Sequence, residues 1–249
     1  MALVVIRTRD FQLAYRLIKK LRSLKVSHIQ LEINQIIPIG TPLWFSTPEE
    51  VNTSKDPNGV ACNINNVDYV VNKTLNKILA GPNVKILTFG VDSGPRPGLA
   101  WFTDDRLIGS KQLELVDEVI DEIINIVNQI SPKFPAKTLI KIGNGHRTIS
   151  NRIVNKCLNN NFQVQLIDEK HTSLGSRHDH VSSAKSIGLK HGIPICDKLE
   201  IVPTRGEVRE IQRISRLVSG GKATIPSNLA ISVAIGKLSL IEAVKLHSR

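Results

Sequence analysis

Residues 86–94 read ILTFGVDSG, and residues 95–101 continue as PRPGLAW. One carboxylate, Asp92, therefore stands at the end of an apolar run that is typical of a buried strand. Burying an ionised Asp costs several kcal/mol unless a cation or a set of donors compensates for the lost water. The neighbouring Gly90 and Gly94 permit a tight turn and the close approach of a ligand. We expect Asp92 to act in metal binding or phosphate chemistry; the alternative is a carboxylate satisfied by turn amides.

The pattern that follows predicts a mixed α/β sheet. Three strands are joined by short turns and two strand–helix crossovers come next, an order that places helices on the faces of the sheet. The expected strands are 84–91, 97–103, 106–112, 137–142 and 162–167, and the expected helices are 113–130, 147–160 and 179–190.

Residues 84–192 resemble the ribonuclease H-like superfamily, and within it the RuvC/YqgF branch of Holliday-junction-resolvase-like proteins. The first strand carries GVDSG at 90–94. Residues 166–173, LIDEKHTS, are similar to the Asp-Glu-Arg-x-Thr-Thr segment of the YqgF family. Residues 179–184, DHVSSA, are similar to the Asp-x-x-Ala-Ala start of that family's last helix. The resemblance implies a ribonuclease H-like fold and a metal-dependent nuclease.

The same resemblance implies a site for Mg²⁺ or Mn²⁺ made by Asp92, Glu169 and Asp179, which would act as catalytic metal ligands. Carboxylates at these places suit the chemistry, because metal-assisted phosphodiester cleavage stabilises the attacking and leaving oxygens with bound cations. Asp168 is the alternative to Glu169, since adjacent strand residues point to opposite faces. Asp179 has a second interpretation as a helix cap.

Residues 141–148 read KIGNGHRT and contain no carboxylate, whereas RuvC resolvases carry a Glu close to this place. The YqgF branch also lacks it, so the resemblance to that branch is closer. The turn offers backbone amides and Arg147 to a phosphate, or it is an ordinary strand-to-helix turn. The missing Glu also supports a different function, that of a non-catalytic nucleic-acid-binding or ribosome-binding protein which retained the fold.

Three histidines, His171, His178 and His180, cluster in the sequence around the expected acidic site. They could orient water, carry protons or contact phosphate, and they could equally be surface residues.

Flanking segments extend this central part on both sides. Residues 1–83 are expected to form a small α/β domain, with strands at 2–6 and 27–33 and helices at 10–25, from 47–50 onward and at 66–80; residues 52–65 are expected to be a loop. Residues 193–249 are expected to form a basic helical C-terminal extension. On a helical wheel its arginines share one face. These candidate nucleic-acid contacts are Arg205, Arg209, Arg213 and Arg216. Two short helices after Gly220-Gly221 indicate either a helix-turn-helix-like module or plain packing.

The net charge of +11 lies in the two flanks. Residues 1–40 hold 7 Lys/Arg against 2 Asp/Glu and residues 198–249 hold 9 against 4, whereas residues 41–197 hold 17 against 16. Basic flanks around a nearly neutral centre favour DNA or RNA as the partner; the alternative is that the basic flanks only aid solubility.

No apolar run is long enough to cross a membrane, and Arg7 and Arg9 come too soon for a signal peptide, so we expect a cytoplasmic protein with no membrane partner. A homodimer is possible, as junction resolution generally requires two-fold symmetry. Three scattered cysteines, Cys62, Cys157 and Cys196, argue against a disulfide framework and are interpreted as small core residues.

Overall fold

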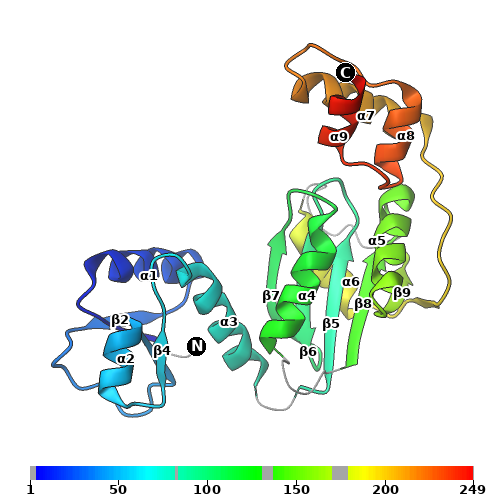
Figure 1. Ribbon diagram of the computed structural model, residues 1–249. Coiled ribbons are helices and arrows are strands. Elements are labelled where there is room, and N and C mark those ends of the chain that lie inside the picture. Colours follow the sequence, from blue (N-terminus) through cyan, green and yellow to red (C-terminus); the bar gives the residue numbers. More distant parts are fainter. Residues whose placement is uncertain (1–3, 82–83, 131–136, 170–178, 249) are drawn as a thin grey trace. The chain divides into compact units, whose positions relative to one another are not determined.

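The computed structural model describes residues 4–81, 84–130, 137–169 and 179–248. The chain divides into two compact units, residues 1–79 and 80–249 (Figure 1). The expected fold class, mixed α/β with a helical C-terminal region, is confirmed. Within the described ranges, no helix is both long enough and apolar enough to span a bilayer.

The first unit contains a parallel sheet with strand order β2-β1-β3-β4. Its core forms where the apolar stripe of α1, Leu13, Leu17 and Leu21, meets the sheet and α3. Asp10 caps α1 as expected, because its side chain accepts the N–H groups of residues 12 and 13. The elements are β1 (Val4–Arg7), α1 (Phe11–Ser23), β2 (His28–Leu31), β3 (Leu43–Ser46), α2 (Pro48–Ser54), β4 (Gly59–Ala61) and α3 (Val67–Ala80).

The carboxylate of Glu50 forms hydrogen bonds with residues at the ends of both β1 and β3. Glu50 accepts hydrogen bonds from Thr8 Oγ1 at 2.6 Å, from the Arg9 N–H at 2.8 Å and from the Ser46 hydroxyl. Burial raises the pKa of Glu50, but the hydrogen bonds from Ser46, Thr8, Arg9 and Thr47 outweigh burial and lower this pKa to about 2. Glu50 is therefore ionised at neutral pH.

The second unit is built on a mixed sheet with strand order β10-β9-β8-β5-β6-β7. Strands β5, β6 and β7 form an antiparallel meander, whereas β8 and β9 run parallel to β5. This is the mixed sheet of meander and parallel strands that the sequence predicted. Its elements are β5 (Ile86–Asp92), β6 (Gly98–Thr103), β7 (Arg106–Gln112), α4 (Glu118–Ile130), β8 (Lys137–Gly143), α5 (Arg147–Asn159), β9 (Gln163–Ile167), α6 (His180–Leu189) and β10 (Ile193–Ile195).

Alternation along β5 separates the two faces of this sheet. Leu87, Phe89 and Val91 enter the large core shared with α4 and α5. The opposite face carries Gly90 and is covered by α6. Helices on both faces explain why six of the seven residues of β5, those from Leu87 to Asp92, are buried.

Three short strands were not predicted. β3 is buried at all four positions, so it lacks the alternation of a half-exposed strand. β4 lies in the expected loop 52–65 and pairs with β3, and its three residues are too few for a periodic signal. β10 pairs antiparallel with β9. The sheet therefore continues past the domain boundary that was expected after residue 192.

The C-terminal helices belong to the second unit and surround a small apolar core of Ile225, Ala230 and Ala243. They are α7 (Arg205–Val218), α8 (Ser227–Ala234) and α9 (Leu240–His247). A turn with Gly236 in the left-handed region, at a φ of +78°, separates α8 from α9. Among the cysteines, Cys62 and Cys157 are buried as expected, but Cys196 is exposed, so its interpretation as a core residue was wrong.

Candidate functional site

The candidate site begins at Asp92, the last residue of β5, whose exposed fraction is only 8%. Asp92 lies on the face of the sheet that α6 covers, because it is two residues from Gly90. The contact with α6 is close: a Cβ atom on Gly90 would lie 2.1 Å from the Ala184 carbonyl oxygen, and one on Gly98 would lie 1.8 Å from the His180 carbonyl oxygen. The backbone of α6 therefore rests directly on the sheet beside Asp92.

His180, the first residue of α6, is the hydrogen-bond partner of Asp92. Its Nδ1 lies 2.9 Å from Asp92 Oδ2. A carboxylate can only accept, so Nδ1 carries the hydrogen and Nε2 is directed elsewhere. Sequence reasoning placed His180 among the nucleic-acid contacts and missed this role. The available signal was its position beside Asp179, at the start of a helix that was expected to begin close to Asp92.

A buried lysine fixes the other end of α6. Lys141 on β8 donates from Nζ to the Gly188 carbonyl oxygen over 2.9 Å. Burial lowers the pKa of Lys141, and the negative charge of Asp105 opposes that shift. Helix α6 is thus attached to the sheet at its start through Asp92 and near its end through Lys141.

Glu169 follows β9 and lies over the turn that ends β8. The Gly145 N–H donates to Glu169 Oε1 over 3.0 Å, and a Cβ atom on Gly143 would lie 1.9 Å from the same oxygen. The missing side chains at both glycines therefore make room for this carboxylate. Asp168, in contrast, is exposed, and Glu169 is the one of the two that is directed into the site.

Asp92 and Glu169 are brought to one edge of the sheet, because the parallel strands β5, β8 and β9 end there together. Burial raises the pKa of Glu169; the negative charges of Asp92 and Asp168 raise it further, while the Gly145 N–H and His146 oppose the shift. Two carboxylates that repel each other at a partly buried edge are a donor set that a cation would stabilise.

The remaining predicted site residues are the metal ligand Asp179 and two histidines that were expected to contact nucleic acid. Asp179 is the N-cap of α6, where its Oδ1 accepts the Ser182 N–H over 2.9 Å, so it performs the capping role that the sequence left as its second interpretation. His171 and His178 lie outside the described residues. Within the part of the chain that the structure describes, no three His, Cys, Asp or Glu side chains form a ready-made metal site.

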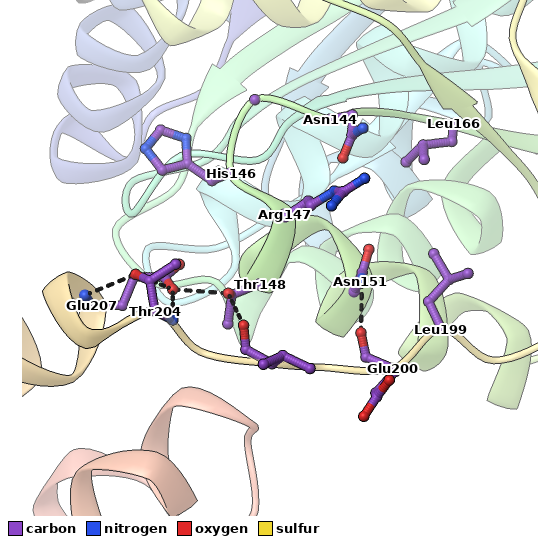
Figure 2. Close-up of a pocket in the computed structure, with 12 residues that line it drawn as sticks. Asn144, His146, Arg147, Thr148, Asn151, Leu166, Leu199, Glu200, Thr204 and Glu207 are labelled. Carbon is purple, nitrogen blue, oxygen red and sulfur yellow. Dashed lines mark hydrogen bonds between the residues drawn. The ribbon is translucent and has the colours of Figure 1, made fainter. Parts of the chain in front are cut away.

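A hollow of about 930 Å³ lies at the start of α5 (Figure 2), and its lining includes Gly145, whose N–H contacts Glu169. Gly145, His146 and Arg147 line one side of it. On the other side, Thr148 Oγ1 donates to Glu207 Oε2 over 2.9 Å, and Asn151 Nδ2 donates to the Glu200 carbonyl oxygen over 2.7 Å. The side chain of His146 makes no capping hydrogen bond to α5. Arg147 is exposed at the rim.

The four arginines of α7 are all exposed, as the helical wheel predicted. Arg213 pairs with Glu210 through two hydrogen bonds of 2.8 and 2.7 Å. Val208 and Ile211 pack toward the core of the three helices, but Leu217 and Val218 near the end of the helix are exposed. The two short helices α8 and α9 pack against α7 around this core.

Comparison with known proteins gives partial matches. Residues 204–249 are similar to a family described as a three helical bundle domain. No curated protein matches the sequence.

Among solved structures, the chain is similar to Marinitoga piezophila Argonaute in complex with 5′ OH guide RNA and target DNA, with 13% identity and a TM-score of 0.30 over 97% of this chain and 54% of that chain. A second structure of that Argonaute, with 5′ OH guide RNA, gives 12% identity and a TM-score of 0.28 over 67% of this chain and 39% of that chain.

Proposed function

We propose that this protein is a metal-dependent nuclease that hydrolyses phosphodiester bonds in structured nucleic acid. The observation that carries the proposal is the convergence of Asp92 and Glu169 at one edge of the sheet, where Asp92 is buried and the pKa of Glu169 is raised. The ribonuclease H-like topology and the resemblance of the three motifs to the RuvC/YqgF branch support it. They make four-way DNA junctions and precursor RNA the first substrates to test.

The residues present fit a hard divalent cation. Mg²⁺ takes oxygen ligands and is commonly held by one or two carboxylates together with water and substrate phosphates, and Asp92 and Glu169 would supply those carboxylates for Mg²⁺ or Mn²⁺. When bound, such a cation polarises a phosphoryl oxygen and makes water a better nucleophile. Asp179 is not needed for this set and keeps its role as the cap of α6.

Other side chains of the chain have supporting roles in this proposal. His180 holds the Asp92 carboxylate in one orientation through Nδ1 and directs Nε2 toward solvent or substrate. Arg147, beside the Gly145 N–H that contacts Glu169, would bind a substrate phosphate at the rim of the hollow. The exposed arginines of α7 would bind phosphates further along the nucleic acid.

The proposal is tested with the full chain on labelled four-way junction, duplex and single-stranded DNA and RNA, in Mg²⁺, in Mn²⁺ and in chelator. We expect cleavage that requires the cation and that falls by at least about 100-fold in Asp92→Asn and Glu169→Gln, the order of loss seen when a transition-state contact is removed. Asp168→Asn is the matched control and should cleave like the wild type. No cleavage of any substrate, or equal cleavage by wild type and Asp92→Asn, would contradict the proposal.

A second candidate function is non-catalytic binding of nucleic acid or of a ribosome by a retained fold. Two observations favour it: Asp92 already has a partner in His180, and the described residues present two carboxylates at the site instead of three. In that case Asp92→Asn would leave binding unchanged and no cation would produce cleavage. The mass of the protein in solution, alone and on a junction, would test the homodimer that symmetric junction cleavage requires.

A further inference from the structure

Helix α1 in the first unit carries an aromatic pair that faces water. Phe11 is 85% exposed and Tyr15 is 67% exposed. The chain contains only 2 Tyr, 2 Trp and 6 Phe residues, so large rings are scarce. Two of them stand four residues apart on one helix, although the opposite side of the same helix supplies the core with Leu13, Leu17 and Leu21.

Two basic side chains continue the aromatic pair along the helix. At 100° per residue, Phe11, Tyr15, Lys19 and Arg22 fall within a sector of about 80°; we name them the aromatic–basic stripe. Helix α1 contains no Asp or Glu. Lys20, outside the stripe, pairs with Asp68, whereas in the described part of the chain neither Lys19 nor Arg22 forms an ion pair. The charge of the stripe is therefore available to an anionic partner.

A hollow of about 840 Å³ opens beside the first ring of the stripe. Its lining includes Phe11, Arg9 and the polar side chains of Thr8, Gln30 and Asn34, and also one carboxylate, that of Glu32. An aromatic ring in the wall of a hollow of mixed polarity offers a flat apolar face next to hydrogen-bond donors and acceptors. Nucleobases have the same combination of a flat face and polar edges.

We propose that the aromatic–basic stripe binds single-stranded nucleic acid, with bases stacked on Phe11 and Tyr15 and phosphates held by Lys19 and Arg22. Exposed rings beside a positive surface are the arrangement that recognises unpaired strands, because stacking requires a base face that a duplex keeps covered. Four residues of helix separate the two rings by about 6 Å along the axis, so each can take its own base. The stripe is in a different unit from Asp92 and binds independently of catalysis.

The binding test uses the full chain with a fluorescent oligothymidylate in chelator, so that no cleavage takes place. Phe11→Leu with Tyr15→Leu keeps apolar side chains but removes both rings, and we expect the dissociation constant to rise by about tenfold or more for each ring. Gln12→Ala, an exposed change on the same helix outside the stripe, is the matched control and should bind like the wild type. Both variants should keep the unfolding midpoint of the wild type, because all three positions are exposed.

A cross-linking experiment locates the contact directly. An oligonucleotide that contains 5-iodouracil is irradiated on the protein, and the protein is digested with trypsin, which cuts after Arg9 and Arg16 and releases both rings in the peptide 10–16. We expect adducts on that peptide. Adducts confined to other peptides together with unchanged affinity of the leucine variant would overturn the proposal, whatever the result of the cleavage assay.

Two other partners are distinguished by the same variants. If the stripe were a membrane-surface site, the leucine variant would retain oligothymidylate affinity and lose binding to vesicles rich in anionic lipid. If it were a protein-docking surface, the apolar leucines would still contact the partner protein, and the oligonucleotide would not cross-link to the peptide 10–16. Either outcome contradicts the proposal, while cation-dependent cleavage by the wild type would leave the proposed function intact.

Discussion

The close contact between α6 and the sheet makes Gly98→Ala a sharp test of how Asp92 is positioned. The new Cβ atom would lie 1.8 Å from the His180 carbonyl oxygen, and real Cβ contacts shorter than 3.0 Å essentially do not occur, so the start of α6 must move by at least the difference of 1.2 Å. The His180 Nδ1 to Asp92 Oδ2 distance of 2.9 Å would then exceed hydrogen-bond length if the helix moves directly away.

We expect Gly98→Ala to lower the free energy of unfolding by about 1–3 kcal/mol, which is the usual cost of overpacking. The matched control is Gly206→Ala near the start of α7, where the nearest atom would lie 3.9 Å from the new Cβ. Alanine there should be neutral or stabilise by up to about 1 kcal/mol, because glycine is the poorer helix former. Urea unfolding followed by far-UV circular dichroism measures both. A Gly98→Ala variant as stable as the wild type would refute the packing of α6 on this strand.

Three further predictions concern charge. Because the folded-state pKa of Glu50 is lowered from 4.5 to about 2, ionised Glu50 stabilises the folded state above pH 4.5, and this stabilisation is lost as the pH falls toward 2. After allowance for screening by solvent, we expect Glu50→Gln to lower the free energy of unfolding by about 1–2 kcal/mol at pH 7 and by much less at pH 2. Unfolding is followed by Trp44 fluorescence in a Trp101→Phe background. Because the folded-state pKa of Glu169 is raised, ionisation of Glu169 lowers the stability of the folded state as the pH rises above 4.5. At pH 7 and without divalent cations, Glu169→Gln should therefore have a higher melting temperature than the wild type. A lower melting temperature for the variant would count against the convergence of the two negative charges. On α7, Arg209→Gln should reduce the slope of log affinity for nucleic acid against log salt concentration by about one. Arg213→Gln should reduce this slope less, because Arg213 is paired with Glu210. Equal slopes for both variants and the wild type would exclude α7 as the binding surface.

The sequence predicted the sheet of the second unit well because its signals are local. The apolar run of β5, the turns of the meander and the stripe of α4 each depend on residues close in the chain, and the order of elements then limits the topology. The position of Asp92 at the end of a buried strand was predictable on the same basis.

The partners of the site were not predictable because they depend on tertiary packing. The residue type of Asp179 at a helix start indicated the cap of α6, but the hydrogen bond between His180 and Asp92 joins residues 88 positions apart and left no local signal of its own. Gly90 and Gly98 have no side chains and therefore allow α6 to contact the sheet closely. The sequence shows only that glycines stand within a strand, and does not show which element packs against them. The short strands β3, β4 and β10 owe their existence to neighbouring strands, and three or four residues contain too little periodicity to reveal them.

The most direct test of the central claim is a titration of the full chain with Mn²⁺, followed by electron paramagnetic resonance of the free ion. The account predicts that the wild type and Asp168→Asn bind the cation equally, and that Asp92→Asn and Glu169→Gln each weaken binding by about tenfold or more, because each removes one of two charged oxygen ligands. A wild type that binds no Mn²⁺, or an Asp92→Asn variant that binds it as tightly as the wild type, would contradict the claim that these two carboxylates form one cation site.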